Sequence, residues 1–271
     1  MQVRLCGPVE LVGPLGSRTP SGRIRRGLLA SLALSSGRYV TATRLIEQCW
    51  EEPTGSAQAN LRSHLAGLRR DLEIVARGSS GMLTSLRGSG GSYRMNNLGP
   101  QQLDLVNVQW LVTAARRSLR GGERETALLH CMQAKHVWRG SFGADLPATE
   151  YFTAQAGAIL RTYQQYLEID SAAQLCAGQY RSALDKLHNA LAEHPDRAAF
   201  WQLLATACFL NRDTSAALAA VDECRARRLD IGLDLPAEIA ALQRHILSDD
   251  RPAILTQIHA QWGPHCAEIP A

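Results

Sequence analysis

Arginines and small polar residues gather on one short stretch of the chain, residues 56–72, at spacings that suit contact with a nucleic acid. Leucines recur there at helical spacing and predict one narrow apolar seam, formed by Leu61, Leu65, Leu68 and Leu72. The residues predicted on the opposite face are Ser63, Ala66, Gly67 and Arg70, with Asn60, Arg62 and Arg69 on its flanks and His64 close to the seam. Because a guanidinium group pairs with phosphate or with a guanine edge, this helix is predicted to contact DNA.

Each of these residues also has a plainer interpretation. An arginine on a helix face is by default solvated, and His64 fits a partly buried structural histidine at least as well as a phosphate contact. Arg69 and Arg70 are the stronger candidates, since two adjacent guanidinium groups offer forked donors to phosphates and bases.

A basic hairpin is predicted shortly after this helix. Two β-prone segments, residues 83–87 and 92–96, flank a Gly-Ser-Gly-Gly turn and carry Arg87 and Arg94. A helix with arginines on one face, followed by a basic hairpin, is the layout of a winged helix-turn-helix, in which the helix enters the major groove and the wing touches the backbone or the minor groove. Arg87 and Arg94 are therefore predicted to contact phosphates.

The distribution of charge supports a nucleic-acid-binding N-terminal part. Residues 1–100 hold 13 Arg, no Lys and six acidic residues, a local balance of +7, while the remaining 171 residues carry −3. The basic excess thus lies entirely where the predicted winged helix lies, as electrostatic attraction to DNA requires. Chance asymmetry in a surface of mixed charge is the alternative.

Composition offers no support for catalysis. The seven cysteines form no C-x-x-C pair, and neither they nor the histidines show the spacing of a metal site. The glycine-rich segment 88–91 lacks the Gly-Lys-Ser/Thr that completes a phosphate-binding loop. We therefore expect no enzyme activity, no cofactor and no metal. Free cysteines and the lack of a long apolar run predict a cytoplasmic protein that does not enter a membrane.

The elements before the arginine-bearing helix complete a small first domain, predicted to span residues 1–98. Alternating apolar residues predict two short strands within residues 3–11, and residues 13–22 read as a loop rich in Gly, Pro and Ser. Two further helices follow the loop. Thr41 and Ser56 are the predicted N-caps of the second and third helices.

From residue 103 onward the chain is almost wholly helical in pattern. Residues 178–184 match residues 212–218 at an offset of 34, with small residues where helices would cross. This period is typical of tetratricopeptide (TPR) repeats, although two unrelated helical pairs are the alternative. The predicted fold is therefore mainly α with a small β component: a winged helix-turn-helix domain, an all-α TPR-like domain over residues 103–247, and a weakly ordered tail over residues 248–271.

Several motifs in a fixed order resemble the Streptomyces antibiotic regulatory protein (SARP) family of transcriptional activators. No single motif is specific, but together they cover nearly the whole chain. They fall at residues 5–11, 25–30, 45–50, 60–70, 103–105 and 128–140. The wing departs from the family, because it reads Gly-Ser-Tyr-Arg-Met at residues 91–95 where the family more often has Gly-Tyr-Arg-Leu.

The resemblance implies an OmpR-type winged helix joined to a bacterial transcriptional activation domain. It further implies binding to direct repeats at promoter DNA, homodimer formation on that DNA, and recruitment of RNA polymerase holoenzyme through its sigma factor and alpha subunit. Control of antibiotic or other secondary-metabolite genes and a nucleoid-associated location follow from the same resemblance. The competing hypothesis is a TPR-type protein-interaction scaffold whose winged helix does not bind DNA.

Overall fold

The computed structural model of the chain describes residues 1–86 and 91–262. These residues divide into two compact units. The first holds residues 1–110 and 134–162, and the second holds residues 111–133 and the chain from residue 163 onward. The unit that contains the winged helix is therefore larger than residues 1–98.

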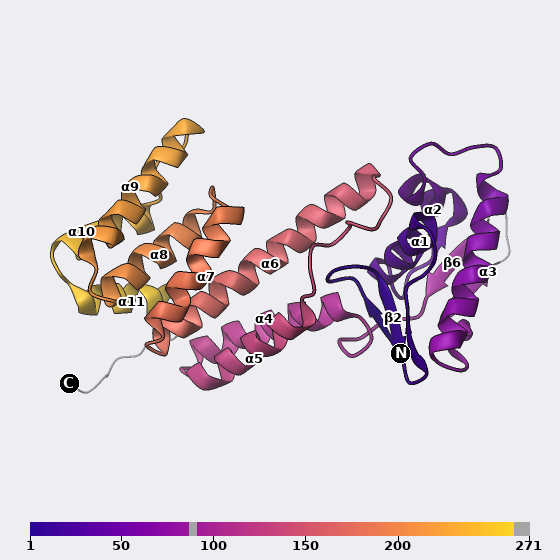
Figure 1. Cartoon of the computed structure of the whole chain (residues 1–271), viewed down its shortest axis with the longest axis horizontal. Coiled ribbons are helices and arrows are strands. Elements are labelled where there is room, and N and C mark those ends of the chain that lie inside the picture. Colours follow the sequence, from indigo (N-terminus) through magenta and orange to yellow (C-terminus); the bar gives the residue numbers. More distant parts are fainter. Residues whose placement is uncertain (87–90, 263–271) are drawn as a thin grey trace. The chain divides into compact units, whose positions relative to one another are not determined.

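Two small antiparallel sheets and three helices make up the N-terminal part of the first unit (Figure 1). One sheet has the order β1-β2-β3 and the other the order β4-β6-β5, so that the predicted wing hairpin is β5–β6. The elements are β1 (Gln2–Arg4), β2 (Glu10–Gly13), β3 (Gly16–Arg18), α1 (Arg23–Leu34), β4 (Val40–Thr41), α2 (Ala42–Cys49), α3 (Ala57–Val75), the 3-10 helix η1 (Ser79–Met82), β5 (Leu83–Leu86) and β6 (Ser92–Met95). The predicted winged helix-turn-helix is confirmed.

The N-terminal sheet is larger than the sequence predicts. Val3 of β1 pairs with Leu11 of β2, and both side chains are buried, in line with their alternation in the sequence. The prediction of a loop over residues 13–22 was wrong in part, because β3 lies within it and pairs with β2. All three β3 residues are exposed, so no apolar alternation marks this strand in the sequence.

The helix starts follow the predicted caps in position. Thr41 Oγ1 accepts a hydrogen bond of 3.2 Å from the Arg44 backbone N–H, as an N-cap residue does. Ser56 precedes α3 as predicted, but its hydroxyl forms no capping hydrogen bond and instead accepts one from Asn60 Nδ2 at 3.3 Å. The prediction of a side-chain cap at Ser56 was therefore wrong.

A segment far along the chain, residues 138–149, completes the first unit and is called the strap below. The backbone N–H of Arg139 donates to the Cys6 carbonyl at 2.8 Å. Asp145 accepts the Val9 N–H through Oδ2 at 3.0 Å. The strap thus satisfies backbone groups beside the first β-turn that the sheet itself leaves unpaired.

The strap also lies against helices α1 and α2. Thr149 Oγ1 donates to the Gln48 carbonyl at 2.8 Å, and both side chains are buried. An added Cβ on Gly27 would be 3.0 Å from Pro147 Cδ, so glycine allows this close approach. The strap therefore forms part of the core around the winged helix.

Asp104, the first residue of α4 (Asp104–Arg120), joins that helix to the N-terminal sheet. Its carboxylate is 1% exposed and accepts the backbone N–H groups of Leu5 at 2.7 Å and Cys6 at 2.9 Å. Burial raises the pKa of Asp104 above its ordinary value, although these hydrogen bonds and the nearby Arg139 act in the opposite direction. The carboxylate is a structural acceptor that ties two distant segments together.

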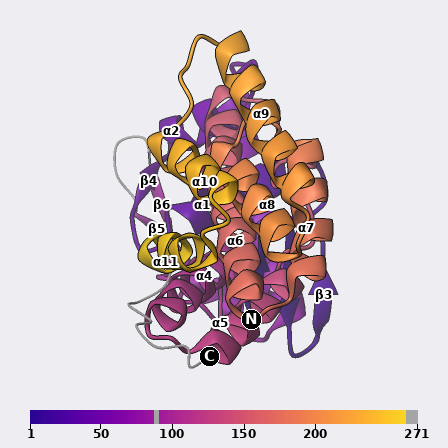
Figure 2. The ribbon, with the colours of Figure 1, turned by 90° about the vertical axis from the view of Figure 1, so that its left-hand side faces the viewer.

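Within its described residues, the second unit consists of helices joined by turns and loops, and Figure 2 shows α8 lying between α7 and α9. Helices α4, α5 (Arg124–Val137) and α6 (Glu150–Cys176) contribute residues to both units. The remaining helices are α7 (Tyr180–Glu193), α8 (Ala198–Leu210), α9 (Thr214–Asp230), α10 (Ala237–Leu247) and α11 (Arg251–Trp262).

The predicted 34-residue repeat is also a repeat of backbone geometry. Gly178 has a φ of 75° and Arg212 a φ of 68°, so both turns place a residue in the left-handed region. The following N–H groups donate to the carbonyl five residues earlier in each turn, Gln179 to Gln174 and Asp213 to Cys208, both at 2.9 Å. Equivalent small residues are buried where the helices cross, namely Ala173 with Ala207 and Ala183 with Ala217.

Helix α11 corrects the predicted tail. The prediction of a weakly ordered tail over residues 248–271 is wrong for residues 251–262, because Ile254, Ile258 and Trp262 are buried against the unit. Three apolar residues at spacings of four form a helical seam in spite of Pro252, which occupies the first turn, where proline is tolerated. Residues 263–271 lie outside the described residues.

Replacing Asp104 by asparagine is expected to destabilise the first unit. The amide offers a donor in place of one acceptor oxygen, so that the Leu5 or Cys6 N–H loses its partner. We expect the free energy of unfolding to fall by about 1–3 kcal/mol, measured by urea denaturation. The exposed Asp196→Asn is the matched control, expected to change it by less than about 0.5 kcal/mol. An Asp104→Asn chain as stable as the wild type would contradict the role of this carboxylate.

Candidate nucleic-acid interface

Helix α3 presents one buried face and one exposed face. The predicted seam is confirmed, since Leu61, Leu65, Leu68 and Leu72 are each at most 1% exposed. The exposed side, called the outer face below, consists of Ala59, Arg62, Ser63, Ala66 and Arg70, with the exposed Asn60 on one flank. Neither Arg62 nor Arg70 forms a hydrogen bond or an ion pair with the residues that the structure describes, so their donors face solvent.

Gly67 does not belong to the outer face, and the sequence-based placement was wrong. The residue is buried, and an added Cβ would be 2.6 Å from Cζ of Arg25. The guanidinium group of Arg25, from α1, thus occupies the position where a side chain of residue 67 would lie. Seam spacing alone gives no sign of this, because the covering group comes from another helix.

Arg69, on the other flank, connects α3 to the wing. It is half-buried, and its Nε donates to the Leu83 carbonyl of β5 at 3.2 Å. Contact of Arg69 with DNA stays a prediction, and the structure adds a second role in placing the wing beside α3.

On the wing, Arg94 stacks on an aromatic ring that the sequence did not single out. Its Cζ lies 4.6 Å from the centroid of the Tyr39 ring, and Tyr39 is 42% exposed. Val40 pairs with Tyr93 in the antiparallel ladder, which puts the preceding Tyr39 opposite Arg94. Only the pairing of β4 with β6 brings these two together. Arg87 lies outside the described residues.

His64 is half-buried at the edge of the seam. Its ring meets Trp50 edge to face, with centroids 6.0 Å apart. Burial, and then the positive charge of Arg25, lower the pKa of His64 below its ordinary value. This lowered pKa disfavours the charged imidazolium, which favours the structural interpretation of this residue over a cationic phosphate contact.

Ion pairing distinguishes Arg18 and Arg25 from the exposed arginines of α3. Asp71 of α3 is 1% exposed and pairs with both Arg18 and Arg25, so its single negative charge offsets one of these two positive charges and engages both guanidinium groups within the unit. Arg62 and Arg70 keep their charge in solvent. The first unit can therefore offer DNA a helix face with two cationic donors, flanked by a basic wing.

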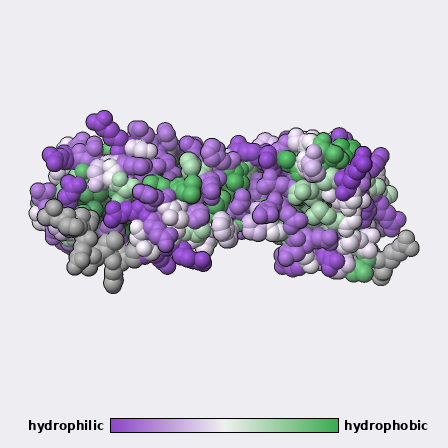
Figure 3. All heavy atoms as spheres, turned by 90° about the horizontal axis from the view of Figure 1, so that it is seen from below, coloured by the Kyte–Doolittle hydropathy of each residue, from purple (hydrophilic) through white to green (hydrophobic). Residues whose placement is uncertain are grey.

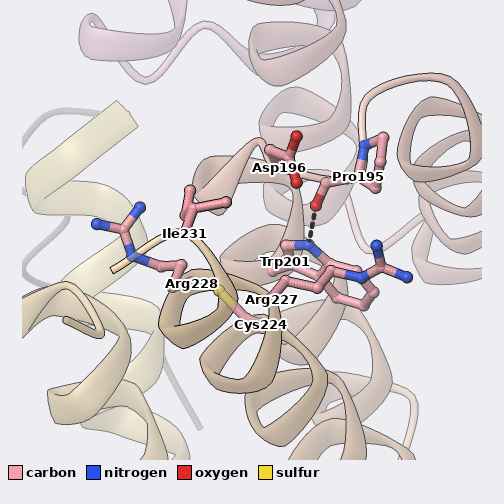
Figure 4. A pocket seen from close by; sticks show the side chains of 7 residues that line it. All are labelled: Pro195, Asp196, Trp201, Cys224, Arg227, Arg228 and Ile231. Atoms are coloured by element: carbon pink, nitrogen blue, oxygen red, sulfur yellow. Dashed lines mark hydrogen bonds between the residues drawn. The ribbon is translucent and has the colours of Figure 1, made fainter. Parts of the chain in front are cut away.

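Two hollows in the second unit flank the loop between α7 and α8. One is an open, polar cleft of about 320 Å³, lined by Gln164 and residues 193–197. The other is a shallow niche shown in Figure 4, where the indole N–H of Trp201 donates to the Pro195 carbonyl at 2.6 Å and the Arg227 guanidinium lies 5.7 Å from the indole ring. The indole N–H of Trp201 already donates to the Pro195 carbonyl. The side chains around this niche therefore contribute to the packing of the loop between α7 and α8.

On the face drawn in Figure 3, hydrophilic residues predominate and apolar residues form several patches among them. No described helix combines the length and apolar character needed to cross a membrane. Among residues 1–86 and 91–262, no group of three or more His, Cys, Asp or Glu side chains is arranged to hold a metal ion.

Two family models match the chain. The model described as the bacterial transcriptional activator domain matches residues 103–247, more than half of the chain. The model described as the C-terminal part of transcriptional regulatory proteins matches residues 20–94, which include α3 and most of the wing.

Curated relatives are regulatory proteins. Regulatory protein AfsR of Streptomyces coelicolor is 31% identical over 85% of this chain, which spans only 22% of the length of AfsR. Regulatory protein DnrI of Streptomyces peucetius is 26% identical, over 92% of this chain and 93% of DnrI.

The fold is similar to that of a solved structure of Mycobacterium tuberculosis EmbR in complex with a low-affinity phosphopeptide. The TM-score is 0.84 at 24% sequence identity, over 96% of this chain and 69% of the EmbR chain.

The lowered pKa of His64 has a measurable consequence for stability. Because the folded-state pKa lies below that of the unfolded chain, the unfolded state binds more protons once the pH falls below about 6.5. The stabilisation that neutral His64 gives the folded state is therefore present above this pH and is lost progressively as the pH falls below it. We expect His64→Gln to lose less thermal stability than the wild type between pH 7.5 and pH 5.0, measured by circular dichroism. His188→Gln, at an exposed histidine of α7, is the control, and equal losses in all three chains would contradict the assignment.

Proposed function

Because the chain belongs to the Streptomyces antibiotic regulatory protein family of transcriptional regulators, we propose that it binds specific promoter sequences and activates transcription from them. The observation that carries this proposal is the outer face of α3. Two arginines without internal partners lie there on a helix whose other side is buried, so the helix can enter the major groove without unpacking.

The proposed contacts divide into two kinds. Arg62 and Arg70, together with Asn60 and Ser63, lie where a helix in the major groove meets base edges. Arg94, held against Tyr39 on the wing, lies where phosphates are contacted in winged helices, and Arg69 and Arg87 complete the proposed set.

We further propose that two copies occupy direct repeats, and that the helical unit recruits RNA polymerase holoenzyme through its sigma factor and alpha subunit. The helical repeats support this part, since stacked helix pairs offer the kind of extended surface that binds protein partners. The proposal includes a role in antibiotic or other secondary-metabolite biosynthesis, which fits the similarity to the regulatory proteins AfsR and DnrI. Binding to promoter DNA would place the protein in the cytoplasm and on the nucleoid.

Arg70→Ala tests the reading face. A duplex selected by the wild-type chain from a randomised library is the probe, and a scrambled duplex of the same length is its reference. If Arg70 meets a base edge, its removal costs about 1–3 kcal/mol of binding to the selected duplex, measured by fluorescence anisotropy. Arg120→Ala, at an exposed arginine of α4, is the matched control and should keep wild-type affinity. Equal affinity of both variants would show that the reading face lies elsewhere.

Activation is tested by transcription in vitro with purified polymerase holoenzyme on a promoter that carries the selected sequence. We expect the full chain to raise transcript yield at least fivefold, and Arg70→Ala to lose most of this increase because it no longer occupies the site. A chain that binds the promoter without raising the yield would argue against activation. A chain that binds no DNA at all would favour the competing TPR-type scaffold.

A further inference from the structure

We propose that Arg25 of α1 is a positioning residue that fixes the rotation of α3, and with it the direction in which the outer face points. This inference rests on the proposed function of α3 in reading DNA. Arg25 itself lies away from the outer face, since its side chain is only 20% exposed and is turned toward α3.

The first step is the buried acid on α3. Asp71 is 1% exposed, and its two oxygens are bound separately: Oδ1 by Arg18 Nε at 2.5 Å and Oδ2 by Arg25 Nη1 at 3.3 Å. Removing a carboxylate from water without partners is costly, so Asp71 must stay where both guanidinium groups reach it. The two arginines come from different elements, β3 and α1, and therefore hold α3 from two sides.

The second step concerns Gly67, which has no side chain and lies one turn before Asp71 on α3. The guanidinium of Arg25 lies directly on Gly67, where an added Cβ would be 2.6 Å from Cζ and 2.8 Å from Nε. Arg25 also acts electrostatically on His64, whose pKa is lowered by burial and then by this charge. Residues 64, 67 and 71 are three and four apart, so Arg25 follows one stripe of α3 over two turns.

The third step concerns what the leucine seam leaves undetermined. Apolar contacts are not directional, so a seam of leucines fixes the rotation of a helix less precisely than directional contacts do. Hydrogen bonds and ion pairs are directional. The stripe under Arg25 adjoins the outer face on one flank, while Arg69 and its bond to Leu83 hold the other flank. Arg62 and Arg70 lie on the same face of α3. A rotation of the helix would therefore move both side chains away from the bases that we propose they contact.

Gly67→Ala is a mild way to disturb this arrangement. The group that must move is the far end of a flexible arginine side chain, so the variant is expected to fold. Gly157→Ala in α6 is the matched control, because it makes the same change in a helix where the nearest atom is 3.9 Å away. Any general effect of exchanging a helical glycine for alanine appears equally in both variants.

The test measures the ratio of the affinities for the selected and the scrambled duplex at one salt concentration. We expect Gly67→Ala in the full-length chain to lower this ratio at least tenfold, with affinity for the scrambled duplex within threefold of wild type, and Gly157→Ala to change neither. Arg25→Lys keeps the charge near Asp71 but lacks the planar fork over Gly67. In that background Gly67→Ala should lower the ratio by less than a further threefold.

Two outcomes would overturn the proposal: a Gly67→Ala chain as selective as the wild type, or an equal loss on adding Gly67→Ala to Arg25→Lys. Hydrogen exchange of peptides from residues 57–75, measured without DNA, separates this inference from the function on which it rests. If the wild type selects no duplex, the proposed function fails, and Arg25 is judged on exchange alone. Faster exchange in Gly67→Ala than in Gly157→Ala then supports its positioning role, and equal exchange refutes it.

Discussion

Burial of one face of α3 is the constraint on which the rest of the first unit depends. Four leucines of this helix are removed from water, and each contributes roughly 1.5–3 kcal/mol. The opposite face does not have to be apolar, so it can carry residues such as Arg62 and Arg70 that make contacts outside the chain. Strands β2 and β3, helices α1 and α2, and the ion pairs of Asp71 all serve to keep the buried face covered and the outer face open.

Part of the packing around the winged helix comes from a segment that is distant in the sequence. The strap, residues 138–149, and Asp104 both satisfy backbone groups of the first β-turn. The strap also lies against α1 and α2. The family model of the activator domain begins at residue 103, so these residues belong to the activator domain in sequence and to the winged-helix unit in structure. A change in the strap therefore acts directly on the packing of the helices behind α3.

The helical unit uses the same type of turn twice to end one helix and begin the next. Gly178 and Arg212 adopt the same left-handed conformation 34 residues apart, and the same hydrogen bonds close both turns. Arg212 adopts a backbone conformation that glycine adopts more readily. The packing register of the helices, and not the local preference of arginine, therefore sets the turn there.

The sequence by itself determined several features that depend on local spacing: the leucine seam of α3, the wing hairpin, the cap at Thr41 and the repeat of 34 residues. These features follow from helical and strand periods within a few turns of chain. Tertiary structure decided the rest. Gly67 is covered by Arg25, Tyr39 meets Arg94 through the pairing of β4 with β6, and Asp104 reaches Leu5 across 99 residues. Each of these depends on two segments meeting in space, and the spacing along one segment carries no record of its distant partner.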